Sequence, residues 1–463
     1  MSYNIRVKAL SVFAGDTRLM GPISFATSPG DTLIIMGETG AGKSLVAQAI
    51  LGTLPCALRS EGQIKVNGRK VDTLSQVERA GMWGRELAAL PQEPWRALDP
   101  LMLSFKQIFE TYYFVAGRAL AEARSDTKHT FETLDLKGAE RRLPGTLSGG
   151  MAQRVAFAAA TAGNAPILIA DEPTKGLDTE RYNKIVTLLA KVPASGGTLI
   201  AITHEASVTR RLGGHVIVLR DGQLVEQGQV ETVLTKPSSS YTKQLLDADP
   251  QSWSQSEPHP TGKTVLTATN LTIKRNGKEL ISSFNLTIKA AERVALTGPS
   301  GVGKTTLLDA LAGLLPPTRG TVNRGTNLPR DAVQKLYQDP PAAFPARVPL
   351  RHTLRDVARL HKTDWNYVIK QLENLGIHPS LLDRRPDAVS GGELQRISIA
   401  RALTVRPRVL LADEPTSRLD PITQRDTLSM LARIAAEGNI AIVLVTHDYN
   451  IASKWADRLI KLV

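Results

Sequence analysis

The sequence predicts an α/β protein of two tandem domains, each with a mainly parallel sheet core, an antiparallel β subdomain and a helical subdomain. Two glycine-rich loops of one pattern follow apolar segments, GETGAGKS at Gly37–Ser44 and GPSGVGKT at Gly298–Thr305. The same motifs then follow each loop in the same order, and Ser148 and Ser390 lie 242 residues apart. Strand-like and helical stretches alternate in both halves, which is typical of a parallel sheet. An ordered repeat of this kind indicates a duplicated domain.

We expect the first domain at residues 1–246, a linker at 247–263 and the second domain, with a shorter C-terminus, at 264–463. A chain of 463 residues has room for two or three domains, and the duplication selects two. The linker is rich in Ser, Pro and Gln and has no apolar period, so we expect it to be exposed.

Each domain opens with alternating strand-like segments, which predict the antiparallel subdomain, and continues with a buried strand that leads into the glycine loop. Helix-prone stretches then predict the helical subdomain, and two further apolar strands lead to an acidic pair and to a histidine. The opening segments span 5–12 and 265–273, the buried strands 32–36 and 293–297, the helical stretches 118–134 and 365–375, and the later strands 167–170, 409–412, 198–203 and 440–446.

Composition limits the classes of protein and partner. Hydrophobic residues make up 42% and charged residues 22%, which is a globular composition. The chain has no apolar run of about 18 residues that would span a bilayer, and we expect no export because its N-terminus lacks an apolar signal segment. Cys56 is the single cysteine, which excludes an intrachain disulfide and a cysteine-built zinc or four-cysteine iron–sulfur site.

The net charge of +13 fits nucleic acid, anionic lipid or simply a solvated surface. Aromatic residues are only 5%, and no basic block carries interleaved aromatics. We therefore expect no nucleic-acid partner.

Both glycine loops match G-x-x-x-x-G-K-[ST], in which backbone N–H groups and the following helix N-terminus surround phosphate oxygens. The lysine is expected to reach the β- and γ-phosphates, and the final hydroxyl is expected to bind Mg²⁺. A chance glycine loop is the alternative, but two copies, each after an apolar strand, exclude it. The predicted phosphate-binding residues are Gly37, Glu38, Thr39, Gly40, Ala41, Gly42, Lys43 and Ser44, and Gly298, Pro299, Ser300, Gly301, Val302, Gly303, Lys304 and Thr305.

An acidic pair follows an apolar strand in each half. Asp171 and Asp413 are placed at the mouth of the sheet, where a carboxylate can hold Mg²⁺. Glu172 and Glu414 are then suited to act as general bases on the attacking water. Acidic pairs are also common on surfaces, but the aliphatic run before them and the Pro-Thr after them favour the catalytic interpretation. With the phosphate loops, they predict a nucleoside-triphosphate hydrolase.

A serine-glycine-glycine motif opens a predicted helix in each half and offers a hydroxyl and free N–H groups to an anion. Each domain already has a phosphate loop, so a second anion site implies a nucleotide held by another domain. The motif alone also forms ordinary turns, but the acidic pair begins 23 residues later in both copies. The residues are Ser148, Gly149 and Gly150, and Ser390, Gly391 and Gly392.

This set of motifs resembles the nucleotide-binding domains of ATP-binding-cassette (ABC) proteins, over nearly the whole chain and twice. The resemblance implies ATP and Mg²⁺ as cofactors and ATP hydrolysis as the reaction. It also implies roles for further residues: Gln92 and Gln338 sense Mg²⁺ and the membrane partner, His204 and His447 contact the γ-phosphate, Asp178 and Asp420 cross the dimer interface, and Phe13 stacks on adenine where the second half has Arg275.

In the family mechanism, two ATP molecules are held head-to-tail between two such domains. The resemblance therefore implies that Lys43 shares its ATP with Ser390, and Lys304 with Ser148. One polypeptide supplies both halves, so we expect an internal pseudo-dimer rather than a homodimer.

Two segments resemble the peptide/nickel importer subfamily: QEPWRALDPLM at Gln92–Met102 and KPSSSYTKQLL at Lys236–Leu246. Those importers usually use two separate ATPase subunits, and this chain looks like such a pair fused. The resemblance implies import of peptides, nickel or a metal chelate. It also implies two transmembrane permease subunits, indirect cooperation with a solute-binding protein, and a peripheral place on the cytoplasmic face of the inner membrane.

Trp95, Leu98 and Phe344 are candidates for the permease-docking surface, with burial in their own domains as the alternative. A soluble tandem ABC ATPase acting on ribosomes or nucleic acid is a second function class. Such proteins usually carry a long charged linker, zinc cysteines or an iron–sulfur domain, which this sequence lacks. An exporter ATPase is a third class, which the importer-like segments disfavour.

Overall fold

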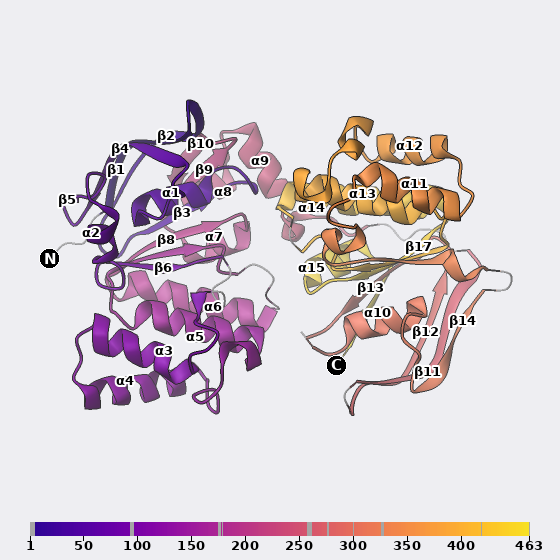
Figure 1. Ribbon diagram of the computed structural model, residues 1–463, viewed down its shortest axis with the longest axis horizontal. Helices are drawn as coiled ribbons and strands as arrows, with labels where there is room; N and C mark the ends of the chain where they lie inside the picture. Colours follow the sequence, from indigo (N-terminus) through magenta and orange to yellow (C-terminus); the bar gives the residue numbers. More distant parts are fainter. Residues whose placement is uncertain are drawn as a thin grey trace. The chain divides into compact units, whose positions relative to one another are not determined.

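The computed structural model describes residues 5–92, 97–174, 177, 179–256, 262–275, 277–299, 301–325, 328–417 and 419–462. The chain separates into two compact units, residues 1–249 and 250–463 (Figure 1). Each unit has a mainly parallel sheet, an antiparallel sheet and a group of helices, which confirms the predicted α/β class.

The first unit is built around a six-stranded sheet in the order β10-β9-β3-β8-β7-β6, in which β9 and β10 are antiparallel and the other neighbours are parallel. An antiparallel sheet in the order β2-β1-β4-β5 accompanies it. The strands are β1 Ile5–Ala14, β2 Thr17–Thr27, β3 Thr32–Met36, β4 Leu58–Val66, β5 Arg69–Lys70, β6 Leu87–Leu90, β7 Ile167–Asp171, β8 Thr198–Thr203, β9 His215–Arg220 and β10 Gln223–Gln229.

Helices connect these strands. The phosphate loop leads from β3 into α1, and the helical subdomain contains α3, a π-helical turn at Thr111–Val115, α4 and α5. The helices are α1 Lys43–Leu51, α2 Gln76–Ala80, α3 Ser104–Glu110, α4 Leu120–Thr133, α5 Gly149–Thr161, α6 Thr179–Ala194, α7 Ala206–Leu212, α8 Val230–Thr235 and α9 Ser240–Asp247.

The second unit repeats this plan with a five-stranded parallel sheet in the order β15-β16-β17-β13-β18 and an antiparallel sheet in the order β12-β11-β14. The strands are β11 Thr264–Arg275, β12 Lys278–Lys289, β13 Arg293–Thr297, β14 Arg319–Arg324, β15 Val333–Leu336, β16 Val409–Asp413, β17 Ala441–Val445 and β18 Arg458–Lys461. The helices are α10 Lys304–Ala312, α11 Leu350–Leu360, α12 Trp365–Asn374, α13 Gly391–Leu403, α14 Pro421–Gly438 and α15 Tyr449–Trp455.

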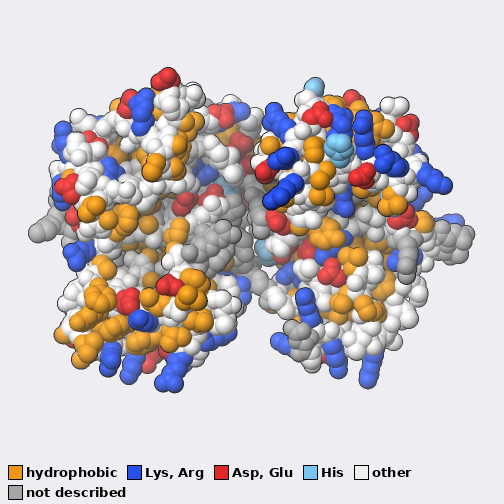
Figure 2. All heavy atoms as spheres, in the orientation of Figure 1, with side chains coloured by type: hydrophobic (Ala, Val, Ile, Leu, Met, Phe, Trp, Pro, Cys, Tyr) orange, Lys and Arg blue, Asp and Glu red, His pale blue; other side chains and the backbone are white. Residues whose placement is uncertain are grey.

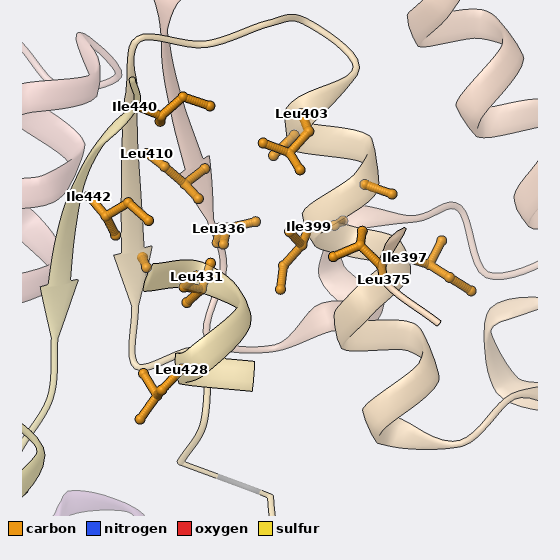
Figure 3. Packing of buried hydrophobic residues seen from close by; sticks show 14 of the residues in the cluster. Leu336, Leu375, Ile397, Ile399, Leu403, Leu410, Leu428, Leu431, Ile440 and Ile442 are labelled. Carbon is orange, nitrogen blue, oxygen red and sulfur yellow. The ribbon is translucent and has the colours of Figure 1, made fainter. Parts of the chain in front are cut away.

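Buried aliphatic side chains hold the helices of the second unit on its sheet (Figure 3). Leu410 and Ile442 from β16 and β17 lie in one cluster with Ile399 of α13 and Leu431 of α14. All four are fully buried, so truncation of one to alanine is expected to cost about 2–5 kcal/mol. This packing holds β16, whose last residue is Asp413 of the acidic pair.

The segment expected as an exposed linker differs in part from that expectation. Residues 250–256 lie against the second unit, where Trp253 packs on the core cluster. The backbone N–H of Ser256 donates to the carbonyl of Lys454 at 2.8 Å, and the guanidinium of Arg293 donates to the Ser256 hydroxyl at 3.0 Å. Trp253 is a lone, partly buried apolar anchor in a Ser- and Pro-rich segment, so no periodic pattern in the sequence indicates this packing.

In the parts of the chain that the structure describes, none of the helices combines the length and apolarity needed to cross a membrane.

Candidate nucleotide-binding sites

Each phosphate loop has a backbone that requires glycine. Gly40 and Gly42 have φ of 88° and 85°, in the left-handed region that side chains disfavour. At Gly37, a Cβ atom would lie 2.2 Å from the carbonyl oxygen of Leu219. The second loop has the same constraint at Gly298, whose Cβ would lie 2.6 Å from the carbonyl oxygen of Leu462. At Gly37 and Gly298 the loop backbone has no room for a side chain, and each loop leads directly into the N-terminus of α1 or α10.

The loop lysines lie across their own loops. The ammonium of Lys43 donates to the carbonyls of Gly37 and Glu38 at 2.9 and 2.7 Å. Lys304 makes the same contacts with Gly298 and Pro299 at 2.8 and 3.0 Å. Both lysines are buried, so each holds a desolvated positive charge at the mouth of a loop.

Asp171 and Asp413 are the last residues of β7 and β16. In the second unit, the Thr305 hydroxyl donates to Oδ1 of Asp413 at 3.2 Å. Burial raises the pKa of Asp413, while the nearby Lys335 opposes that shift. A hydroxyl and a carboxylate side by side are hard oxygen donors of the kind that Mg²⁺ prefers, so the residues present fit this metal.

The two catalytic candidates, Glu172 and Glu414, follow these aspartates with φ of 44° and 47°, a left-handed conformation that is rare for glutamate. The N–H of Glu172 donates to the carbonyl of Ile202 at 2.8 Å, and that of Glu414 donates to Val445 at 3.1 Å. The chain thus turns sharply after each strand while its backbone stays tied to the neighbouring strand. Backbone strain of this kind is concentrated at functional sites.

Each glutamate meets the glutamine and histidine predicted from the sequence. Glu172 accepts from Nε2 of Gln92 at 3.3 Å, and its Oε1 lies 3.1 Å from Nδ1 of His204. In the second unit, Glu414 accepts from Gln338 at 3.0 Å and lies 3.0 Å from His447 Nδ1. Lys43 joins the first group, with Nζ 3.8 Å from Glu172 Oε1.

The serine-glycine-glycine motifs stand at the N-termini of α5 and α13. Ser148 caps α5 by accepting from the N–H of Met151 at 3.4 Å. Ser390 forms a reciprocal capping box with Glu393, whose carboxylate accepts from both the N–H and the hydroxyl of Ser390 at 2.8 Å. The second motif is therefore held by one more charged partner than the first.

The remaining sequence candidates are placed as follows. Asp420 caps α14 by accepting from the N–H of Thr423 at 3.0 Å. The ring of Phe13 is covered on one face by the guanidinium of Arg59, 4.4 Å from its centroid, and Arg275 is exposed. Asp178, Ser300 and Trp95 lie outside the described residues.

Leu98 and Phe344 are buried, with exposed fractions of 6% and 7%. The alternative of burial in their own domains therefore holds for these two residues, and their assignment to a docking surface is corrected.

Sequence reasoning missed two groups. The hydroxyl of Tyr241, on α9, accepts a hydrogen bond from the N–H of Glu38 in the first loop at 3.1 Å. In the second unit, Lys335 of β15 bridges Asp309 of α10 and Asp413. The available signal for the second group was a lysine inside the short strand Val333–Leu336, which reads Val-Gln-Lys-Leu. Tyr241 had only its place in the tail motif.

Comparison with known proteins then decides the family. The family model described as ABC transporter matches residues 20–175 and 281–417. The chain belongs to the ABC transporter family. It carries two fused ATP-binding domains of this family, and it hydrolyses ATP.

Two of the relatives illustrate the match, which extends over almost the whole of this chain. The "Peptidoglycan transport ATP-binding protein YejF" of Agrobacterium fabrum (strain C58 / ATCC 33970) is 31% identical and covers 95% of this chain and 86% of its own length. The "Glutathione import ATP-binding protein GsiA" of Escherichia coli (strain K12) is 30% identical and covers 94% of this chain and 80% of its own length.

Among solved structures, the "RNase-L Inhibitor" matches with a TM-score of 0.66 at 21% identity, covering 94% of this chain and 83% of its own. This likeness concerns the tandem fold alone.

Proposed function

We propose that the chain is the energising ATPase subunit of a bacterial importer for peptides or peptide-containing solutes. The observation that carries the proposal is that both halves match ATP-binding proteins named for peptidoglycan transport and glutathione import, over 95% and 94% of this chain. These names favour peptide-like cargo over nickel. The extended segment Gln92–Met102 and the tail Lys236–Leu246 support the same assignment.

We further propose that each site hydrolyses ATP with its own glutamate as general base. Glu172 is held by His204 and Gln92, so its carboxylate is positioned to take a proton as water attacks the γ-phosphorus. The bond from the γ-phosphorus to the bridging oxygen breaks, and ADP and phosphate leave. We propose the same role for Glu414, which accepts a hydrogen bond from Gln338 and lies 3.0 Å from Nδ1 of His447.

The loop lysines and the metal ligands complete the proposed site. When ATP binds, the ammonium groups of Lys43 and Lys304 are proposed to give up their hydrogen bonds to the loop carbonyls and to donate to phosphate oxygens instead. Mg²⁺ is proposed to be held by Ser44, Asp171 and Gln92 in the first unit and by Thr305, Asp413 and Gln338 in the second. When bound, it neutralises charge that develops on the phosphates.

The proposed partners are two permease subunits, which place the chain at the cytoplasmic face of the membrane. Leu101, at the end of the Gln92–Met102 segment, and Leu103, Tyr113 and Phe114 after it are exposed apolar residues of the first unit, and we take them together as one candidate surface. Figure 2 shows hydrophobic side chains gathered over this α3–α4 part of the unit. The ring of Tyr113 stacks on that of Phe109, with centroids 5.8 Å apart. We propose that a short cytoplasmic helix of a permease packs here.

The test is co-expression with candidate permease subunits, followed by a high-salt wash of membranes. Charge-driven lipid binding is screened at 1 M salt, where the Debye length is about 3 Å, whereas apolar packing persists. We expect permease-dependent retention that Leu101→Ser with Phe114→Ser abolishes. Val77→Ser, at an equally exposed apolar position on α2, is the matched control and should retain binding. Equal release with and without permeases would refute the docking proposal.

A further inference from the structure

The second site contains a buried ion-pair cluster at its proposed metal-binding carboxylate. Nζ of Lys335 lies 3.2 Å from Oδ2 of Asp413 and 2.7 Å from Oδ1 of Asp309, and the lysine side chain is 5% exposed. The other oxygen of Asp413 accepts from the hydroxyl of Thr305. The carboxylate offered to Mg²⁺ is therefore already shared between a hydroxyl and an ammonium group.

The equivalent positions of the first unit carry neither of these charges. Lys335 pairs with Leu411 in the sheet, two residues before Asp413; at the same register of the first sheet, Ala89 pairs with Ile169, two residues before Asp171. Asp309 stands five residues after the loop lysine of α10, where α1 has Gln48.

The two charges are thus present together in one unit and replaced together in the other. A buried ammonium facing only the metal ligand would be costly, and Asp309 offsets that cost. We therefore treat Lys335 and Asp309 as a functional pair.

We propose that Lys335 weakens the binding of Mg²⁺ at the second nucleotide site, so that the two sites take up metal-bound nucleotide at different concentrations of free Mg²⁺. Two cations that share one carboxylate repel each other and compete for its oxygens. Lys335 is a positioning residue, because it acts through Asp413. The inference rests on the proposed role of Mg²⁺.

A purely structural role is the competing explanation, in which the cluster only fastens β15 to α10. The two explanations predict different effects of the two variants on the Mg²⁺ requirement. Lys335→Met removes a cation from the carboxylate, whereas Asp309→Asn leaves the lysine wholly on Asp413. A structural fastener would lose stability in both variants. The proposed role shifts the Mg²⁺ requirement in opposite directions.

The experiment uses the full chain with the first site silenced by Lys43→Ala. Binding of a fluorescent ATP analogue (mant-ATP) is measured while free Mg²⁺ is raised, and thermal unfolding is recorded in parallel. We expect the half-saturating Mg²⁺ concentration to fall about tenfold in Lys335→Met and to rise about tenfold in Asp309→Asn, the scale of one neighbouring charge on a carboxylate equilibrium.

The double variant Lys335→Ala with Asp309→Gln copies the first unit, whose equivalent residues are Ala89 and Gln48, and guards against misfolding of a single variant. Its half-saturating Mg²⁺ concentration should match that of the first site, which is measured in a chain whose second site is silenced by Lys304→Ala. An unchanged Mg²⁺ requirement in this variant and in Lys335→Met would overturn the inference. Nucleotide binding without any Mg²⁺ dependence in the unaltered second site would instead overturn the proposed Mg²⁺ role, and this inference with it.

Discussion

At the scale of single residues, Glu172 and Glu414 have nearly the same backbone, the same strand-edge hydrogen bond and the same pair of side-chain partners. A left-handed glutamate costs of order 1–3 kcal/mol, so it persists because the flanking strand and loop hold it there. Both glutamates have this unfavourable backbone conformation, which is expected if both carboxylates take part in hydrolysis.

We therefore predict that Glu172→Gln and Glu414→Gln each slow hydrolysis at the altered site by at least about a hundredfold, the scale for loss of a general base. Glutamine keeps the shape and still binds ATP, so affinity should change little. Single-turnover assays at saturating ATP measure the effect. If one variant hydrolyses at the unaltered rate, that site is regulatory rather than catalytic.

Much of each candidate site was predictable because each motif follows an apolar strand whose end must lie at the sheet edge. Asp171 and Asp413 were placed this way, and so were the strands Thr32–Met36 and Arg293–Thr297. Contacts such as that of Tyr241 with Glu38 span 203 residues, and no periodicity encodes such a pairing.

At the scale of elements, α9 ties the tail of the first unit to its phosphate loop. Tyr241 is buried, the guanidinium of Arg220 lies 4.9 Å from its ring centroid, and its hydroxyl receives the N–H of Glu38. This contact gives the Lys236–Leu246 segment a structural reason to carry tyrosine. It also lay beyond sequence reasoning, as did the π-helical turn after α3, because both depend on tertiary packing.

Tyr241→Phe is predicted to lower the free energy of unfolding of the first unit by about 1 kcal/mol, the scale of one hydrogen bond. It should weaken ATP binding at the first loop by up to about fivefold, if the whole of that energy is used in holding the loop. Tyr112→Phe is the matched control. The hydroxyl of Tyr112 is hydrogen-bonded to that of Thr130 at 2.9 Å and joins the π-helical turn to α4. Calorimetry should show equal ATP affinity in the control; equal affinity in both variants would contradict the role of α9.

At the scale of the whole molecule, the two units carry corresponding sets of site residues, and the surroundings of the two sets differ. The cluster of Lys335 with Asp309 and the capping box of Glu393 each occur beside the second site, and the equivalent positions of the first unit carry Ala89, Gln48 and Met151. We propose that both sets still bind ATP and that one chain, as an internal pseudo-dimer, suffices for this.

The most direct test of that claim is the number of ATP molecules retained by one chain. The Glu172→Gln, Glu414→Gln double variant is incubated with ATP and Mg²⁺, separated from free nucleotide, and its mass and bound ATP are measured by light scattering and chromatography. We predict two ATP molecules per chain at the mass of a single chain. One ATP per chain, or a doubling of mass with ATP, would contradict the account.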